Sequence, residues 1–186
     1  MDNMHLGRIV VIEPYNPSWP TLFHELGVRL RGTLGNAALR IDHIGSTAIP
    51  GLAAKPIIDV QVSVESFNPM EPYRVPLEEG GFVFRDKNPE LTKRYFRERP
   101  GERETHIHVR RAGSFSEQFP LLFRDYLRSH AGDAEEYAAL KVRLAKQHRD
   151  DPLGYTTAKG DFIWRVIARA DQWAQDTGWE PGPSDA

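Results

Sequence analysis

Residues 42–62 combine the residue types that phosphate and metal chemistry need. Gly45 and Ser46 end one predicted strand, and Asp59 lies on the next strand along the chain. A Gly-Ser turn can offer backbone N–H groups and a hydroxyl to a phosphate, because glycine lets the backbone approach closely. A carboxylate on the neighbouring strand could hold Mg²⁺ against that phosphate. The spacing favours a site for a phosphorylated ligand, although such turns and single strand aspartates also occur in purely structural roles.

His106 and His108 are candidates for further metal ligands. They alternate along a predicted strand and therefore share one face of it. If that strand neighbours the one that carries Asp59, the three side chains form a two-histidine, one-carboxylate set. Such a set suits Zn²⁺, Mn²⁺ or Fe²⁺ better than Mg²⁺. His43 is a fourth candidate ligand because it lies close to Gly45 in the sequence. The alternative is that the histidines only hydrogen-bond to phosphate, carboxylate or solvent.

Several cationic side chains could contact the phosphates of such a ligand: Lys55, Arg97, Lys141 and Lys159. Arg97 shares a strand face with Lys93 and Tyr95, which could deliver its guanidinium to an anion beside the histidines. Residues 85–111 carry nine Lys or Arg and five acidic residues, so this segment has a net charge of +4 within a chain of net charge -2. Solvated charges on a hairpin are the simpler interpretation for most of them.

The run DHIGSTAIPGLAAKPIIDVQV over residues 42–62 closely resembles the GrpB family, whose members are predicted nucleotidyltransferases of the DNA polymerase β-like superfamily. The resemblance extends from about residue 8 to residue 175. Its shorter blocks are residues 105–109, residues 123–128, Tyr137 with Lys141, and Tyr155 and Thr156 with Lys159. It implies a nucleotidyltransferase fold, a nucleoside triphosphate bound over Gly45, Ser46 and Thr47, and a divalent metal, Mg²⁺, Mn²⁺ or Zn²⁺, on Asp59.

One position departs from the superfamily pattern that this resemblance implies. The pattern is an apolar residue, Gly, then Ser or Gly, a gap, and then Asp, an apolar residue and a second carboxylate. Ile44, Gly45 and Ser46 match its first part, and Asp59 matches its second. Gln61 stands where the second metal-binding carboxylate is expected. Its neutral amide could bind Mg²⁺ only through a weak carbonyl oxygen, which argues against two-metal chemistry.

The resemblance implies transfer of a nucleoside monophosphate from a triphosphate to a small acceptor, with Asp59, Ser46 and Lys55 as catalytic residues. Two alternatives remain open. Gln61 allows a catalytically degenerate nucleotide-binding or regulatory module, and in some bacteria a GrpB-like domain is fused to dephospho-CoA kinase, which suggests support of a coenzyme A enzyme. A metal-dependent hydrolase using Asp59, His106 and His108 is the other.

The elements that must position these residues follow from hydrophobic periodicity. The pattern predicts strands over residues 8–13, 39–44, 57–64, 82–85, 91–98 and 104–110, the last three as an antiparallel addition to the sheet. It predicts helices over residues 19–34, from residue 116, around residues 137–144 and over residues 156–175, with a short or broken one in 67–80. This order favours an α+β domain over residues 1–176, with a mixed or antiparallel sheet, a helical C-terminal part and a disordered tail over 177–186.

Composition bounds the function classes. The chain has 186 residues, 40% hydrophobic and 27% charged, which fits one globular domain and excludes disordered and collagen-like classes. It has no cysteine, so disulfides, thiolate nucleophiles and cysteine metal sites are excluded. The net charge of -2 does not favour nucleic acid as a partner. No apolar run suits a signal peptide or a membrane helix, so we expect a cytoplasmic protein without membrane contacts.

Overall fold

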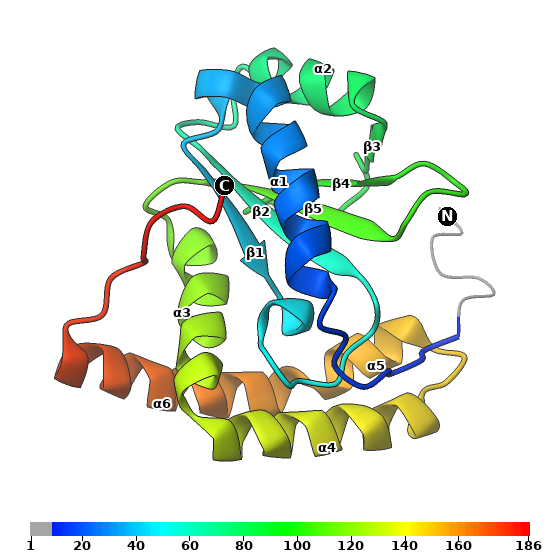
Figure 1. The fold of residues 1–186 in the computed structure, drawn as a ribbon, viewed down its shortest axis with the longest axis vertical. Helices are drawn as coiled ribbons and strands as arrows, with labels where there is room; N and C mark the ends of the chain where they lie inside the picture. The colour runs from blue at the N-terminus through cyan, green and yellow to red at the C-terminus, as the bar shows by residue number, and fades with distance from the viewer. Residues whose placement is uncertain (1–8) are drawn as a thin grey trace.

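The computed structural model describes residues 9–186, in which five strands form one sheet of order β1-β2-β5-β4-β3 (Figure 1). The strands are β1 Arg40–Ile44, β2 Ile58–Val64, β3 Phe82–Phe84, β4 Arg94–Glu98 and β5 Thr105–Arg111. The central pair β2 and β5 runs parallel, whereas the other neighbouring pairs are antiparallel. The protein therefore has a mixed sheet, as the α+β prediction states.

The helices divide between the two sides of this sheet. They are α1 Trp19–Leu34, α2 Glu71–Glu79, α3 Phe115–Ser129, α4 Ala131–Gln147, α5 Pro152–Ala158 and α6 Gly160–Thr177, with short 3₁₀ turns η1 Gly35–Ala37 and η2 Ser46–Ala48. α1 crosses the sheet, while α4, α5 and α6 gather at one end of it (Figure 1). Within residues 9–186, none of these helices is long and apolar enough to span a membrane.

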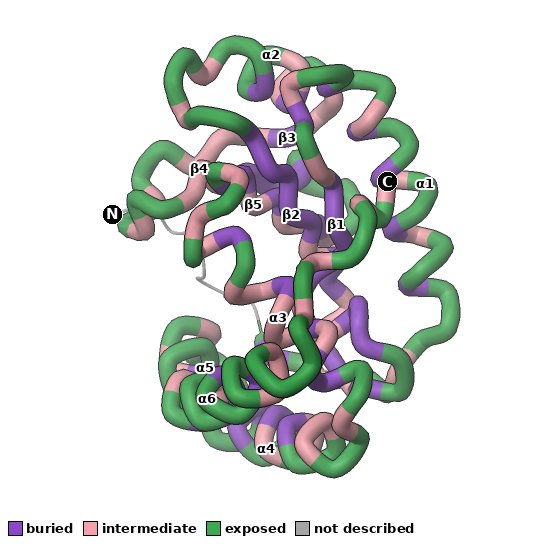
Figure 2. Tube along the Cα trace, turned by 90° about the vertical axis from the view of Figure 1, so that its left-hand side faces the viewer, coloured by how far each residue is buried: buried purple, intermediate pink, exposed green. Residues whose placement is uncertain are grey.

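The main core lies between α1 and the sheet. Trp19, Phe23 and Leu30 recur at helical spacing, and their side chains are buried against alternate residues of β2. Val60 and Val62 are among those residues and are fully buried. Because successive strand residues point to opposite faces, this packing turns the intervening β2 residues toward the face away from α1. Figure 2 shows the central strands as the most continuously buried part of the chain.

A second core joins the C-terminal helices to the loop that follows β1. It contains Tyr126 and Leu127 of α3, Tyr137 of α4 and Phe162 of α6. Ile49 and Leu52 from the loop pack into the same cluster. The loop over residues 45–57 is therefore held between the sheet and the helical layer, which places its backbone precisely enough to form a site.

The predicted strand over residues 8–13 is wrong for the described residues 9–13. Their backbone makes an isolated antiparallel bridge between Glu13 and Ala54, and the amide of Val10 donates to the carbonyl of Arg149. Val10 instead packs against Leu144 and Tyr155 of the helical layer. A β-branched run forms a strand only where a partner strand is available, and here helices occupy that position. Residue 8 lies outside the described residues.

Two further expectations differ from the structure. Residues 82–110 were expected to extend the sheet with antiparallel strands. β3, β4 and β5 are antiparallel to one another, but β5 pairs parallel with β2 in the middle of the sheet. Ile107 and Val109 are fully buried there, which explains why this strand occupies a central place. The predicted helix over 156–175 is two helices, α5 and α6, that meet at Lys159.

The expected disordered tail over 177–186 also differs from what is observed. Residues 182–186 lie along the outer side of β1, with several hydrogen bonds to it. Gly178 ends α6 in the left-handed conformation, with φ 66°, and the chain then turns back toward the sheet. Gly178 thus serves a directed turn, after which the segment returns to the sheet.

Candidate functional site

Asp59, His106 and His108 lie together on the face of the sheet that points away from α1. The parallel register places Asp59 opposite His106 and Gln61 opposite His108. Nδ1 of His106 and Nε2 of His108 each lie 3.2 Å from Oδ1 of Asp59. The side chains are largely but not fully buried, with 26%, 18% and 15% exposure in that order. The predicted two-histidine, one-carboxylate set is therefore assembled from two neighbouring strands.

Electrostatics favour an ionised Asp59 carboxylate beside a neutral His108 ring. Burial alone raises the pKa of Asp59, but hydrogen bonds from His106 and His108 lower it further than burial raises it, to well below its usual range. Burial lowers the pKa of His108 to about 4, against the opposing effect of Asp59. At neutral pH this ring is uncharged, which is the form that ligates metals.

The donor set fits a divalent cation. One ligand atom from each of Asp59, His106 and His108 lies within 4.8 Å of the others. Among residues 9–186, Nε2 of His106 and Nδ1 of His108 are buried and have no hydrogen-bond partner. Each ring therefore hydrogen-bonds to Asp59 through one nitrogen and leaves its other, buried nitrogen without a partner in this part of the chain. Two imidazoles and one carboxylate suit Zn²⁺ or Mn²⁺ better than Mg²⁺.

His43 does not join this cluster, in contrast to the expectation that it could be a fourth ligand. β1 pairs His43 with Val60, and the side chain of Val60 faces α1. His43 therefore also lies on the α1 face of the sheet, opposite the face that carries Asp59, His106 and His108. Its ring stacks on Phe23 with centroids 4.6 Å apart, and its Nε2 lies 3.0 Å from Oγ1 of Thr47. Oγ1 of Thr47 also donates to the carbonyl of Ile57. The side chains of His43 and Thr47 are thus engaged inside the core rather than toward a phosphate.

Gly45 and Ser46 approach the cluster, as predicted. Gly45 has φ 72°, a conformation that favours glycine, and a Cβ placed there would lie 2.7 Å from Oδ2 of Asp59. The turn therefore passes directly against the carboxylate. Ser46 begins η2 and shares a side-chain hydrogen bond with Tyr137 of α4. The turn, the carboxylate and the helical layer meet at this point.

Three lysines surround two tyrosines near this turn. Nζ of Lys159 and Nζ of Lys55 lie 4.5 and 5.4 Å from the ring centre of Tyr155. Nζ of Lys141 lies 4.6 Å from the ring centre of Tyr137 and donates to the carbonyl of Ala53. Burial, with a smaller effect of a neighbouring lysine, lowers the pKa of Lys141 to about 7 and that of Lys159 to about 8. Such a concentration of ammonium groups favours an anionic ligand.

Arg97 lies beside the histidines but already has acidic partners. The register places it opposite His106, on the face that carries the cluster. Its Nη2 lies 3.0 Å from Oε1 of Glu98 and 3.6 Å from Oε1 of Glu104. The predicted approach of Arg97 to the histidines is therefore observed, while its guanidinium is neutralised within the sheet.

Tyr95 and Tyr137 border the site but were not candidates in the sequence analysis. The Tyr95 ring lies 5.3 Å from that of His108 and 5.6 Å from that of His106, measured between centroids. Burial raises the pKa of the Tyr95 hydroxyl above its usual value. The signal for Tyr95 was its alternation with Arg97 on one strand. Tyr137 belongs to a block of the GrpB resemblance but was given no role in the site, because a tyrosine at helical spacing is typical of core.

The comparison with known proteins identifies the family of this chain. A family model described as GrpB protein matches residues 9–169. The chain belongs to the GrpB family. It is 37% identical over 171 residues to the UPF0157 protein YqkA of Bacillus subtilis, covering 92% of this chain and 50% of that protein. It is 34% identical to the UPF0157 protein BH1888 of Halalkalibacterium halodurans, covering 90% and 85% of the two chains.

The GrpB chain is also similar to part of a larger protein, the dephospho-CoA kinase of Mycolicibacterium paratuberculosis. The two are 33% identical, over 92% of this chain and 48% of the kinase. The chain thus spans about half the length of YqkA and of this kinase. Their whole activities therefore do not transfer to the GrpB chain on similarity alone.

Solved structures support the fold. GrpB from Enterococcus faecalis has a TM-score of 0.79 and 33% identity, covering 88% of this chain and 99% of that chain. The Cid1 poly(U) polymerase, as an H336N mutant bound to MgATP, has a TM-score of 0.52 and 14% identity, covering 73% and 44% of the two chains. At that identity the similarity concerns the fold alone. The GrpB chain therefore has a nucleotidyltransferase-like fold, as the resemblance implied.

Gln61 distinguishes this GrpB chain from the two-carboxylate pattern of the superfamily. Its side chain is fully buried, and its Nε2 donates to the carbonyl of Glu117 at the start of α3, at 3.0 Å. The residue is therefore covered by α3 and bonded to its backbone. The second carboxylate position of the pattern is used here to attach a helix to the sheet.

Proposed function

We propose that this chain is a metal-dependent nucleotidyltransferase that transfers a nucleoside monophosphate from a triphosphate to a small acceptor. The observation that carries the proposal is the convergence of the Gly45–Ser46 turn with Asp59, His106 and His108 in a nucleotidyltransferase-like fold. In the transfer, an acceptor oxygen bonds to the α-phosphorus, the bond to the β-phosphate breaks and pyrophosphate leaves. Catalysis of this kind is mostly positioning and charge stabilisation.

The residues of this chain divide that work. Asp59, His106 and His108 would hold the divalent cation, which when bound neutralises phosphate charge. The Gly45–Ser46 turn offers backbone N–H groups and a hydroxyl to the phosphates, and Tyr137 holds the Ser46 hydroxyl in place. Lys55 and Lys159, beside Tyr155, and Lys141, beside Tyr137, supply positive charge for the triphosphate.

Calorimetric titration tests this proposal. ATP, CTP, GTP and UTP are titrated in turn into the wild-type chain with Mg²⁺, Mn²⁺ or Zn²⁺. At least one nucleotide should bind, and Lys159→Met should weaken it about tenfold through loss of a charged contact. Lys146→Met is the matched control, because Lys146 is an exposed lysine of α4. No binding of any nucleotide, or equal losses in both variants, would contradict the proposal.

A second function is favoured by Gln61. This position holds an amide in place of the expected second carboxylate, and the amide is buried against α3. The chain could therefore bind nucleotide without transferring it. The similarity to dephospho-CoA kinase then suggests a regulatory module for a coenzyme A enzyme. Pyrophosphate release separates the two functions: a bound nucleotide that yields none, with any of a panel of small hydroxyl and amino acceptors, selects the binding module.

The same donor set would also serve a metal-dependent hydrolase. Elemental analysis of the purified chain together with product analysis distinguishes this case. Stoichiometric Zn or Mn that is lost in His108→Ala assigns the metal to the cluster, and His24→Ala, a change of an exposed α1 residue, is the control. Release of a nucleoside monophosphate or free phosphate to water, without any acceptor, would select hydrolysis.

A further inference from the structure

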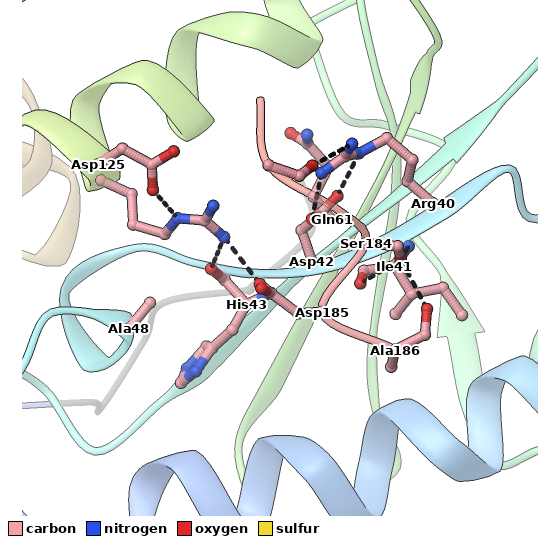
Figure 3. A network of polar contacts seen from close by, with 12 residues as sticks. Arg40, Ile41, Asp42, His43, Ala48, Gln61, Asp125, Ser184, Asp185 and Ala186 are labelled. Carbon is pink, nitrogen blue, oxygen red and sulfur yellow. Dashed lines mark hydrogen bonds and ion pairs between the residues drawn. The ribbon is translucent and has the colours of Figure 1, made fainter. Parts of the chain in front are cut away.

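The outer edge of β1 is covered by residues 182–186, which we call the tail segment. β1 is the end strand of the sheet, and an uncovered end strand exposes unpaired N–H and C=O groups. Here the amide of Ile41 donates to Oγ of Ser184 and the amide of His43 donates to Oδ2 of Asp185, each at 2.9 Å. The carbonyl of Ile41 accepts the amide of Ala186 at 3.1 Å. Figure 3 shows these contacts along the strand.

A buried arginine receives the carboxylate of the tail segment. Nη1 of Arg124 lies 2.7 Å from Oδ2 of Asp185 and donates to the carbonyl of His43 at 3.0 Å. Its side chain is only 3% exposed, and its Nε bonds to Asp125 on the same helix. The Asp185 oxygen thus receives one N–H from Arg124 and one from the backbone of β1. A preoriented guanidinium beside a backbone donor is a carboxylate receptor.

Neighbouring contacts bind the backbone of the tail segment and limit the size of the side chain at position 186. Nη1 of Arg40 donates to the carbonyl of Gly182 at 2.7 Å, and Nη2 of Arg31 donates to that of Ala186 at 2.9 Å. A Cβ placed on Gly27 of α1 would lie 2.6 Å from Cβ of Ala186. There is accordingly room for a small side chain against α1 and for little more.

We propose that this edge of β1 is a docking site for an extended peptide with a serine, an aspartate and a small residue in succession, and that the tail segment fills it from within the same chain. One backbone hydrogen bond and two β1 amides that donate to side-chain oxygens supply affinity, and the Arg124 receptor supplies specificity for the carboxylate. Tethering favours the internal occupant, because a short connection from α6 gives it a high effective concentration. A separate peptide of the same chemistry binds once the internal contact is weakened.

Nuclear magnetic resonance of the full chain tests this inference in two steps. The first compares amide exchange at Ile41 and His43 in the wild type, in Asp185→Asn and in Glu180→Gln. The first variant removes the received carboxylate, so exchange at His43 should rise at least about tenfold, which corresponds to about 1.4 kcal/mol. Glu180→Gln neutralises an exposed acid just before the tail segment and should leave the exchange unchanged.

The second step titrates the labelled Asp185→Asn chain with a C-terminally amidated peptide of residues 182–186, so that aspartate is its one carboxylate. Saturable shifts should appear at the amides of Ile41 and His43, at a lower peptide concentration than the wild-type chain requires. A peptide with asparagine for aspartate should bind at least about tenfold more weakly. Unprotected Ile41 and His43 amides in the wild type, or equal binding of the two peptides, would overturn the proposal.

Discussion

The contact between Gly45 and Asp59 defines the site at the scale of single residues. Glycine is required here for two separate reasons, the positive φ and the 2.7 Å that would separate a Cβ from Oδ2 of Asp59. Close approach of the turn to the carboxylate allows the same phosphate group to meet backbone N–H groups and a cation on Asp59. The absence of a side chain at Gly45 thus leaves the turn in contact with the Asp59 carboxylate.

The matched pair Gly45→Ala and Gly51→Ala separates these two reasons. Gly51 also has a positive φ, 77°, but within the described residues no atom lies within 4 Å of a Cβ placed there. Both variants should lose about 1–2 kcal/mol of unfolding free energy from the strained backbone, measured by urea denaturation. Calorimetry should show weaker Mn²⁺ or Zn²⁺ binding for Gly45→Ala alone. Equal metal affinity in both variants would show that the Asp59 contact is unimportant.

At this scale, the three residues of the cluster were predictable as candidates, but the face that His43 occupies was not. Alternation alone places His106 and His108 on one face, and the spacing after Ser46 marks Asp59. His43 was a candidate ligand only because it lies close to Gly45 in the sequence, and the face of β1 that it occupies depends on the register with β2. That register became visible only once His43 was paired with Val60.

At the scale of elements, the junction of α5 and α6 carries one of the lysines of the site. Lys159 is the residue between the two helices, and its ammonium group lies 4.5 Å from the ring centre of Tyr155, four residues earlier in the chain. The parallel pairing of β5 with β2 is the other feature that matters at this scale, because it brings both histidines to Asp59.

Triphosphate binding should weaken as pH rises from about 7 to about 9. The pKa values of Lys141 and Lys159 are lowered to about 7 and about 8, so these groups are protonated below those values and lose charge above them. Nucleotide phosphates are already ionised in this range, so the change comes from the protein. The affinity should fall by up to about tenfold per pH unit for each deprotonating lysine.

Calorimetry with ATP at pH 7, 8 and 9, without added metal, measures this effect. Lys159→Arg keeps its charge throughout the range and should give a flatter profile than the wild type. A wild-type affinity that stays constant across these pH values would refute the assignment of the two lysines to the phosphates.

Periodicity predicts neither the break between α5 and α6 nor the parallel pairing of β2 with β5. After Lys159 the apolar residues Phe162, Ile163 and Val166 recur at helical spacing, but residues 152–158 carry no such period to mark a separate helix. The parallel pairing of β2 and β5 is a long-range choice among strands of similar composition, and local pattern does not encode it. The number of strands after residue 39, the mixed α+β class and the C-terminal helices were predictable, because each depends on local period alone.

At the scale of the whole molecule, the sheet separates two environments. The face toward α1 is an apolar core with Phe96, Ile107 and Val109 fully buried. The opposite face carries Asp59, His106 and His108. The helical layer meets this second face through Gln61 and the Ser46–Tyr137 contact. A cation on this face would connect β2 to β5 and stabilise the whole fold by mass action.

Metal removal should therefore lower the melting temperature. A ligand at 100 times its Kd adds about 2.7 kcal/mol, and a domain of this size gains roughly 2–4 °C per kcal/mol, so chelation should lower Tm by about 5–10 °C. Scanning calorimetry with Zn²⁺ or Mn²⁺ and then with a chelator measures the shift. His108→Ala should show no chelator effect. A variant that responds like the wild type would place the metal elsewhere.

The parallel pairing of β2 with β5 has a consequence for folding. The two strands are separated in the chain by α2, β3 and β4, so their contact requires closure of a long loop and is slow to form. A slip of one residue would turn both histidines to the α1 face. The three ligands consequently meet only in a chain whose central strands have paired in the correct register. A partly folded chain or a misregistered sheet presents no complete cluster, so metal uptake in a refolding experiment marks the completion of the sheet.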